Sequence, residues 1–176
     1  MSALVSDTAM VMAAGLGKRM RPLTATMPKP LVRVAGKPLI DHTLDRLADA
    51  GVSRAVVNVH YLADALEAHL AERKSPSVDI SDERDQLLET GGGMIKAQGL
   101  LPDPFYCLNS DNIWLEGPRN AFAELSDRWD DAAMDALLLV VPHKRAGNFS
   151  GPGDFHLDAR GLVTRRKSGR IAPFIY

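Results

Sequence analysis

The fold is decided by a stretch near the start of the chain, which reads Thr8-Ala9-Met10-Val11-Met12-Ala13-Ala14-Gly15-Leu16-Gly17-Lys18-Arg19. Its first half is apolar and has the length of a buried strand, and its second half is a turn that contains glycines and cations. A strand that ends in a glycine-rich turn lets backbone N–H groups approach phosphate oxygens, because no Cβ stands in the way. The stretch therefore predicts a strand over residues 8–13 followed by a phosphate-binding loop.

Two well-known glycine loops do not fit this sequence. Met20 stands where the dinucleotide fingerprint of redox enzymes has its third glycine, so the close contact between helix and strand is lost. In the segment Gly36-Lys37-Pro38, proline replaces the Ser or Thr that holds magnesium in a Walker A loop, and Leu31 replaces its first glycine. The loop must therefore hold its phosphates in another way.

Fixed positive charge gathers around the loop. Lys18, Arg19, Arg21 and Lys29 follow one another within a few residues. Arg19 can bind two phosphate oxygens at once, whereas Lys29 carries a compact charge between two prolines that fix its backbone. An ordinary turn with a solvated cationic face would explain any one of these residues, but the whole set favours a triphosphate site.

The rest of the chain alternates between short apolar runs and segments of helical periodicity, which is typical of βαβ units and a mainly parallel sheet. We expect strands over residues 55–59, 78–80, 105–108 and 136–141. Helices are expected from Pro38 to a cap at Gly51, over residues 62–70, from 91 and over about 118–129, and a hairpin over residues 155–164. The pattern predicts a three-layer α/β/α sandwich with a small antiparallel appendage.

Composition limits the class of protein. A length of 176 residues with 45% hydrophobic content suits one domain over residues 1–176. A formal net charge of -1 argues against nucleic acid or a membrane surface as a partner and leaves the oligomeric state open. Cys107 is the single cysteine, so we expect no intramolecular disulfide, and we expect an inert thiol because it lies in an apolar strand. Neither a signal peptide nor an apolar run of about 20 residues is recognisable, which favours the cytoplasm.

The motifs resemble a known family. Residues 13–24, Pro28-Lys29-Pro30-Leu31-Val32 and Gly36-Lys37-Pro38 are similar to the signature of the nucleotidyltransferases that make nucleotide sugars from sugar 1-phosphates, and the resemblance extends from residue 8 to the end. The resemblance implies a Rossmann-like sandwich. It also implies that Arg19 and Lys29 are catalytic residues that bind the triphosphate. Further nucleotide-binding residues would be Ala13, Ala14, Gly15, Gly17 and Lys18.

A second glycine-rich turn, Leu88-Glu89-Thr90-Gly91-Gly92-Gly93, follows the third expected strand. The family carries a comparable motif that reads the edge of the nucleobase, which implies nucleotide binding by Glu89, Thr90, Gly91 and Gly92. A flexible loop with a helix cap at Thr90 is the alternative. This version of the motif is most similar to the uridylyl- and guanylyltransferase branches, which favours UTP and leaves GTP possible.

Asp111 follows the strand expected over residues 105–108 and is the predicted metal ligand and third catalytic residue. Magnesium prefers hard oxygen ligands and is often held by one or two carboxylates together with phosphate oxygens. Family members usually have a second metal-binding carboxylate near the end of the catalytic core, after a strand that would begin where this sequence stops, and no Asp follows at that place. We therefore expect the chain to lack its C-terminal part.

The sugar site is predicted at Asn148, Gly153 and Asp154, because Gly153 matches a family glycine that approaches the sugar phosphate. A plain turn at Gly151-Pro152-Gly153 is the alternative. Two other functions remain open: a glycosyltransferase, which would need an Asp-x-Asp motif where this chain has Asn109-Ser110-Asp111, and a non-catalytic nucleotide or sugar-nucleotide sensor. Release of pyrophosphate would separate an enzyme from a sensor.

Overall fold

The structure, a computed structural model, describes residues 3–147 and 149–176. The chain divides into two compact units, one extending to Asp127 and the other spanning Arg128–Tyr176. The expectation of a single domain over residues 1–176 stays a prediction. Within the described part of the chain, no helix is long and apolar enough to span a membrane.

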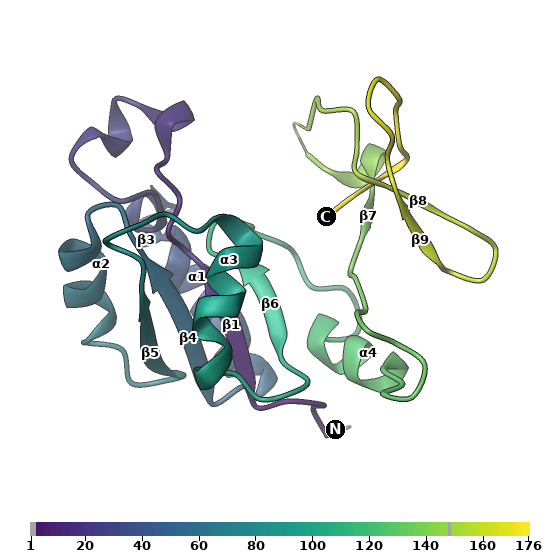
Figure 1. The fold of residues 1–176 in the computed structure, drawn as a ribbon, viewed down its shortest axis with the longest axis horizontal. Helices are drawn as coiled ribbons and strands as arrows, with labels where there is room; N and C mark the ends of the chain where they lie inside the picture. Colours follow the sequence, from purple (N-terminus) through teal and green to yellow (C-terminus); the bar gives the residue numbers. More distant parts are fainter. Residues whose placement is uncertain (1–2, 148) are drawn as a thin grey trace. The chain divides into compact units, whose positions relative to one another are not determined.

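The first unit contains a four-stranded sheet in the order β5-β4-β1-β6. All neighbouring strands are parallel. The strands are β1 (Thr8–Met12), β4 (Arg54–Val59), β5 (Ser77–Asp82) and β6 (Tyr106–Asn109), as Figure 1 shows. The strands expected from the apolar runs in this part of the chain are confirmed to within one or two residues.

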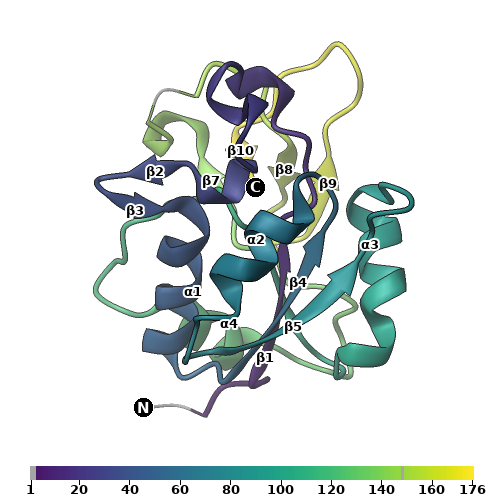
Figure 2. The ribbon, with the colours of Figure 1, turned by 90° about the vertical axis from the view of Figure 1, so that its left-hand side faces the viewer.

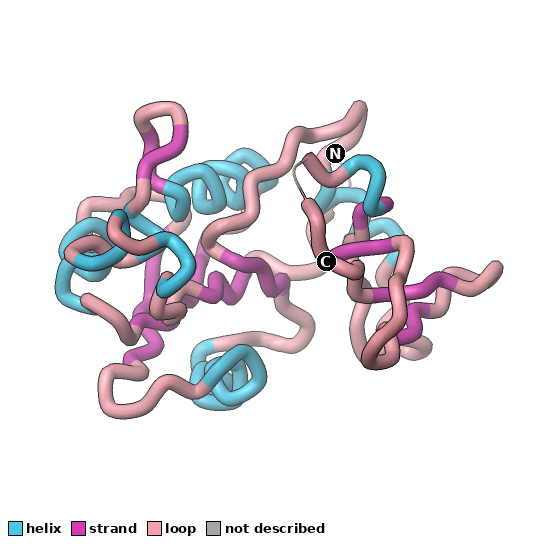
Figure 3. Tube along the Cα trace, turned by 90° about the horizontal axis from the view of Figure 1, so that it is seen from above, coloured by secondary structure: helices cyan, strands magenta, loops and turns pink. Residues whose placement is uncertain are grey.

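Helices cover both faces of this sheet. The helices α1 (Leu39–Ala50) and α2 (Ala63–Leu70) lie on one face, and α3 (Glu89–Ala97) lies on the other (Figure 2). Seen from above, helices flank the strands of this unit on either side (Figure 3). Alternate strand residues serve the two layers, since Ala9 and Val11 belong to the core cluster with α1 and α2, whereas Met10 and Val56 pack with Ala97 of α3. The predicted three-layer architecture is confirmed.

The helix α1 illustrates why these elements form. Ile40, Leu44 and Leu47 recur at helical spacing and are completely buried. Each such side chain contributes about 1.5–3 kcal/mol on burial. Gly51 ends the helix in the left-handed region, with φ +96°, and donates its N–H to the carbonyl oxygen of Ala48. This cap is the one that the sequence predicts.

The segment between β1 and α1 contains only short elements. They are the 3₁₀ turns η1 (Lys18–Met20), η2 (Leu23–Ala25) and η3 (Lys29–Leu31), and the two-stranded ribbon of β2 (Arg33–Val34) and β3 (Lys37–Pro38). A further turn, η4 (Gln98–Leu100), follows α3. Helix α4 (Ala121–Arg128) begins later than the expected 118, because the Asn120 side chain accepts hydrogen bonds from the N–H groups of Phe122 and Ala123 and so caps the helix there.

The second unit is built on an antiparallel sheet in the order β7-β10-β8-β9. Its strands are β7 (Val141–Pro142), β8 (Phe155–Leu157), β9 (Val163–Arg165) and β10 (Phe174–Ile175), with the turn η5 (His143–Arg145) after β7. The hairpin turn between β8 and β9 is confirmed, and the Asp158 carboxylate stabilises it by accepting hydrogen bonds from the N–H groups of Arg160 and Leu162.

One predicted element is wrong. The apolar run 136–141 was expected to be a strand, but residues 136–140 are irregular and only Val141–Pro142 pairs, with β10. Leu139 is 47% exposed, so the run is not a buried core strand. High β propensity yields a strand only where a neighbouring strand edge supplies hydrogen-bond partners. The strand order of the first unit contains no place for this run.

Candidate active site

The strand order creates a natural ligand site at the carboxyl ends of β1 and β6. The chain leaves β1 through α1 and forms β4 on one side, whereas β6 is added on the other side of β1 after α3 has crossed the opposite face. The connections that follow β1 and precede β6 therefore diverge at this edge, and ligands of open α/β sheets bind in such a crevice. The glycine loop follows β1 directly, and Asp111 follows β6.

A cavity of about 640 Å³ occupies this crevice, within the size range of small-molecule sites. Every residue that lines it belongs to the first unit. Its wall consists of residues 12–20, Lys29-Pro30, Asn58, Leu87, Glu89-Thr90 and Asn109-Ser110-Asp111. The structure thus brings together the predicted Ala13, Ala14, Gly15, Gly17, Lys18, Arg19, Lys29, Glu89, Thr90 and Asp111.

The two glycines of the loop have different roles. Gly17 has φ +60°, and a Cβ on it would lie 3.0 Å from Cγ2 of Thr24 and 3.2 Å from Cβ of Lys29. Thr24 is completely buried and donates its hydroxyl to the carbonyl oxygen of Gly17 at 2.7 Å, which fixes the turn. A Cβ on Gly15 would meet no protein atom within 4 Å. Gly17 therefore shapes the loop, and Gly15 leaves its backbone open to a ligand.

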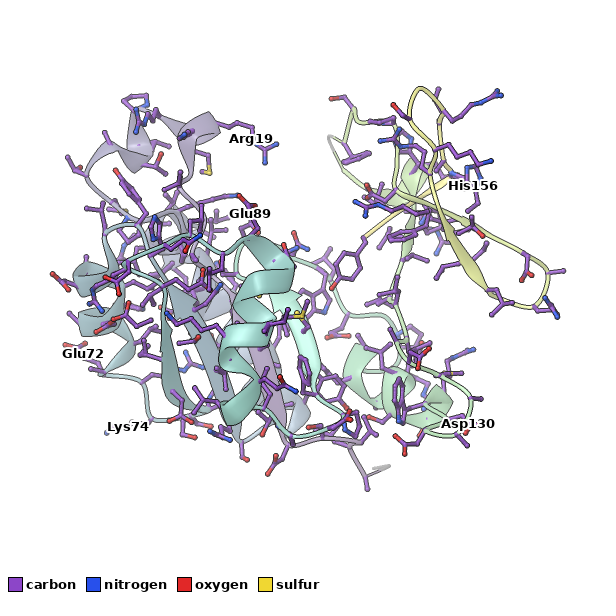
Figure 4. The ribbon with its side chains drawn as sticks, viewed as in Figure 1. Arg19, Glu72, Lys74, Glu89, Asp130 and His156 are labelled. Carbon is purple, nitrogen blue, oxygen red and sulfur yellow. The ribbon has the colours of Figure 1, made fainter. Side chains whose placement is uncertain are left out.

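Two cations of the loop, Lys18 and Arg19, are available to an anion. Lys18 and Arg19 are exposed, and in the part of the chain that the structure describes no carboxylate pairs with either of them. Figure 4 shows Arg19 extending away from the loop at the same end of the sheet as Glu89. Lys29 lies on η3, is half-buried, and forms an ion pair with the Asp111 carboxylate. A cluster of this kind suits a polyanionic ligand.

Asp111 is placed as predicted, at the edge where phosphates would bind. Within residues 3–147 and 149–176, no group of three His, Cys, Asp or Glu side chains could by itself hold a metal ion. Magnesium does not need such a cage, since it commonly takes one or two carboxylates and completes its shell with phosphate oxygens and water. The donor set at Asp111 therefore fits an ion that arrives with a nucleotide rather than a metal held by protein alone.

The second glycine-rich turn contributes Glu89 and Thr90 to the cavity wall, at the N-terminus of α3. Glu89 has φ +58°, a left-handed conformation that costs a residue with a side chain about 1 kcal/mol or more. The wall does not include Gly91 or Gly92, which lie in the first turns of α3. Their role in nucleotide binding stays a prediction.

Of the predicted sugar-binding residues, Gly153 and Asp154 belong to the second unit. Asn148 lies outside the described residues. Gly153 has φ +76°, and a Cβ there would collide with the carbonyl oxygen of Ala172. Asp154 donates its N–H to the carbonyl oxygen of Phe174 at 2.7 Å. Both residues thus have structural roles in the antiparallel sheet, and their sugar-binding roles stay predictions.

Sequence reasoning missed two buried polar residues, Asn58 in the cavity wall and Glu83, which is hydrogen-bonded to it. Asn58 is 1% exposed and Glu83 is completely buried. The Asn58 amide oxygen accepts a hydrogen bond from the N–H of Ala13 at 2.6 Å, and its amide nitrogen donates to Glu83 at 2.8 Å. Asn58 carried a signal, as a polar residue inside the apolar run 55–59, whereas nothing in the local pattern distinguishes Glu83.

Comparison with known proteins agrees with this geometry. Residues 8–165 match the family described as nucleotidyl transferase. N-acetylmuramate alpha-1-phosphate uridylyltransferase from Caulobacter vibrioides is 50% identical over 173 residues, which cover 96% of this chain and 72% of that protein. The enzyme of the same name from Neisseria meningitidis serogroup B is 47% identical over 146 residues, covering 81% of this chain and 63% of that protein.

A solved structure extends the likeness to the fold. HddC from Yersinia pseudotuberculosis, in complex with GMP-PN, superposes with a TM-score of 0.67 at 25% identity, over 96% of this chain and 72% of that chain. The match to the family model covers far more than half of the chain and includes both the glycine loop and Asp111. The chain belongs to the nucleotidyl transferase family.

Proposed function

We propose that this protein transfers the uridylyl group of UTP to a sugar 1-phosphate, giving a UDP-sugar and pyrophosphate. N-acetylmuramate 1-phosphate is the acceptor that we favour, because the Caulobacter relative named for that reaction shares 50% identity over nearly the whole chain. The chain spans 72% and 63% of the lengths of the two uridylyltransferases, so the activity of the whole protein is part of the proposal.

The observation that carries the proposal is the composition of one cavity wall. It combines the open backbone at Gly15, the cations Lys18, Arg19 and Lys29, and the N-terminus of α3 at one edge of the sheet. Backbone donors and fixed charges are what a triphosphate requires, and a helix N-terminus favours an anion. The neighbouring Glu89 and Thr90 supply polar groups for the edge of a base.

The chemistry is an in-line substitution at phosphorus. An oxygen of the sugar phosphate forms a bond to the α-phosphorus of UTP, the bond from that phosphorus to the bridging oxygen of the β-phosphate breaks, and pyrophosphate leaves with the electron pair. No proton transfer is needed, because the attacking phosphate is already an anion at neutral pH. The protein therefore acts by bringing two polyanions together and offsetting their charge.

Each side chain has a role that its position supports. Arg19, exposed at the outer part of the loop, would bind the departing β- and γ-phosphates. Lys29, deeper in the cavity, would offset the charge of the α-phosphate and the incoming sugar phosphate. Asp111 would hold Mg²⁺, which when bound supplies further positive charge to the phosphate oxygens.

GTP is the second candidate donor, because HddC was solved with GMP-PN and its structure superposes over 96% of this chain. Uracil and guanine both have N–H groups that can donate hydrogen bonds to a carboxylate. Glu89 is the carboxylate in the cavity wall that lies beside Thr90, and either base would suit it.

The test is a screen for pyrophosphate release. UTP, GTP, CTP and dTTP are each combined with several sugar 1-phosphates, including N-acetylmuramate 1-phosphate, with Mg²⁺ and with a chelator. We expect the highest kcat/KM with UTP and loss of turnover in the chelator. If UTP binds in calorimetry while no pair releases pyrophosphate, the protein is a nucleotide sensor and the enzymatic proposal fails.

A further inference from the structure

The buried pair Asn58 and Glu83 lies where two strands of the sheet end. Asn58 is the second-last residue of β4, and Glu83 follows β5 directly. The backbone N–H of Glu83 donates to the carbonyl oxygen of Val59 at 2.8 Å, which extends the pairing of the two strands by one bond. The backbones of the rigid sheet thus hold both side chains in register.

The side chains of this pair join two loops of the cavity. On one side, Oδ1 of Asn58 accepts from the N–H of Ala13, the first residue of the glycine loop, at 2.6 Å. In the middle, Nδ2 of Asn58 donates to Oε1 of Glu83 at 2.8 Å. On the other side, Oε2 of Glu83 accepts from the N–H of Leu88, which directly precedes Glu89 and Thr90, at 3.2 Å.

Helix α3 is shaped to close over the pair. Gly93 lies in α3, and a Cβ on it would come 2.7 Å from Oε1 of Glu83 and 3.0 Å from Nδ2 of Asn58. A glycine is therefore required for the helix to approach. The pair is removed from water, and its polar atoms are satisfied by the two loops rather than by solvent.

We infer that Asn58 and Glu83 are positioning residues that fix the glycine loop and the loop that ends at Leu88, where α3 begins, relative to each other, and thereby set the affinity for the nucleotide. The inference rests on the proposed function, since the two loops would hold the phosphates and the base of one ligand. A nucleotide that contacts both loops binds tightly only when their separation is already correct. Otherwise part of the binding free energy is lost in ordering the loops.

Burial alone would not require these residue types. Two apolar side chains could fill the same space, but they would leave the N–H groups of Ala13 and Leu88 without acceptors, and a buried donor without an acceptor is strongly unfavourable. The hydrogen bonds also have a fixed direction: Asn58 accepts from Ala13, Glu83 accepts from Leu88, and Asn58 donates to Glu83 between them. The inference can therefore be tested by exchanging the amide and the carboxylate between positions 58 and 83.

The experiment uses Asn58→Asp, Glu83→Gln and the double variant in the 176-residue chain. In Asn58→Asp, two carboxyl oxygens face each other in the middle and the central hydrogen bond is lost. In Glu83→Gln, the new amide nitrogen must face either Asn58 or Leu88, and each of them presents a donor. In the double variant, the amide introduced at position 83 donates to the carboxylate introduced at position 58. All three hydrogen bonds and the formal charge of the pair are then restored.

We expect each single variant to bind UTP about tenfold or more weakly in calorimetry, and the double variant to bind within about threefold of the wild type. Hydrogen exchange should show faster exchange of the Ala13 and Leu88 amides in the single variants and recovery in the double variant. Urea unfolding of each variant gives the folded fraction, by which the affinities are corrected. If a single variant does not fold, the double variant must still fold, protect both amides and bind UTP.

Tyr106→Phe is the matched control. It removes a hydrogen bond between the Tyr106 hydroxyl and Ser126 at 2.6 Å, at a buried residue that does not line the cavity. It should lower stability and leave the affinity for UTP unchanged.

Wild-type affinity in the folded single variants, or failure of the double variant to recover, would overturn the inference. Failure of the wild type to bind any nucleoside triphosphate would instead overturn the proposed function, and the exchange of the two amides would still report whether the pair fixes the loops.

Discussion

Lys29 shows how one residue of the loop segment is held in the proposed reaction centre. The prolines on either side of it hold η3, and the Asp111 carboxylate at the end of β6 receives its ammonium group. The lysine is therefore oriented before a ligand arrives, and little further ordering is needed when phosphates bind. Preorganised charge of this kind accounts for a large share of catalysis in phosphoryl transfer.

We predict that Lys29→Ala lowers kcat of uridylyl transfer by about 10²–10³, because the charge that offsets the attacked phosphate is lost. Steady-state release of pyrophosphate measures the effect. Lys37→Ala is the control, since Lys37 pairs with Asp45 at 2.5 Å on an exposed surface outside this cavity. Turnover of Lys29→Ala within about threefold of the wild type would exclude the proposed role of Lys29.

Cys107 gives a prediction on pH. Burial raises the pKa of its thiol from 9.0 to about 11, so the folded protein keeps the thiol proton where the unfolded chain has lost it. The stabilising contribution is complete below pH 9 and falls as the pH rises through 9 to 11. By pH 10.5, the wild type should lose about 2 kcal/mol more of its free energy of unfolding than Cys107→Ala does.

Urea unfolding of the wild type and Cys107→Ala at pH 8 and pH 10.5 checks this expectation. Lysines and tyrosines titrate in the same range, but they are common to both proteins and cancel in the difference. Equal losses in the two proteins would show that the thiol is not protected by burial. The raised pKa also agrees with the expectation of an inert thiol rather than a nucleophile.

At the scale of elements, the two glycines of the loop should affect different quantities: Gly17 the stability of the fold, and Gly15 the affinity for UTP. We predict that Gly17→Ala is destabilising by about 1–3 kcal/mol, because φ +60° is unfavourable for alanine and the new Cβ would crowd Thr24 and Lys29. Gly15→Ala should leave stability within about 0.5 kcal/mol, because no protein atom lies near its Cβ. It should nevertheless weaken UTP binding, since the methyl group enters the space reserved for phosphates.

Denaturant unfolding and calorimetry on both variants measure the two effects separately. A Gly15→Ala protein that binds UTP as tightly as the wild type would show that the nucleotide does not approach this part of the backbone. A Gly17→Ala protein of unchanged stability would show that the loop tolerates a different turn.

The sequence predicts an element well when its signal is local. Strands β1, β4 and β6 are largely apolar runs, and Gly51 ends α1 because glycine adopts a positive φ without strain. The run 136–141 has the same local pattern, yet most of it is irregular because pairing depends on a partner that the pattern does not name. The start of α4 was misplaced for the opposite reason, since the cap at Asn120 outweighs the proline signal at Pro118.

The same distinction applies to the site. The glycine loop and the place of Glu89 and Thr90 were predictable because each belongs to a contiguous motif, although residues 89–93 begin α3 instead of forming a turn. The relation between Asn58 and Glu83 was not, because 25 positions separate them and only the parallel register of β4 and β5 brings them together. Their partners Ala13 and Leu88 lie in yet other segments.

At the scale of the whole molecule, the proposed nucleotide site belongs to one unit. The cavity wall and the two core clusters lie in the part of the chain that ends at Asp127. Helix α4 also belongs there, because Phe122 packs edge-on against Tyr106 with 5.1 Å between ring centroids, and Ser126 accepts a hydrogen bond from the N–H of Val5.

A shortened chain that ends at Arg128, the last residue of α4, should therefore fold and bind UTP with a Kd within about threefold of that of the 176-residue chain. At 100 times the Kd, UTP should stabilise either protein by about 2.7 kcal/mol, since the ligand binds only the folded state. Calorimetry gives the affinity, and protection of the Ala13 amide shows that the sheet edge is formed. If the shortened chain folds with this amide protected and yet does not bind UTP, nucleotide affinity depends on residues beyond Arg128, and the division of the molecule into a self-sufficient nucleotide unit is wrong.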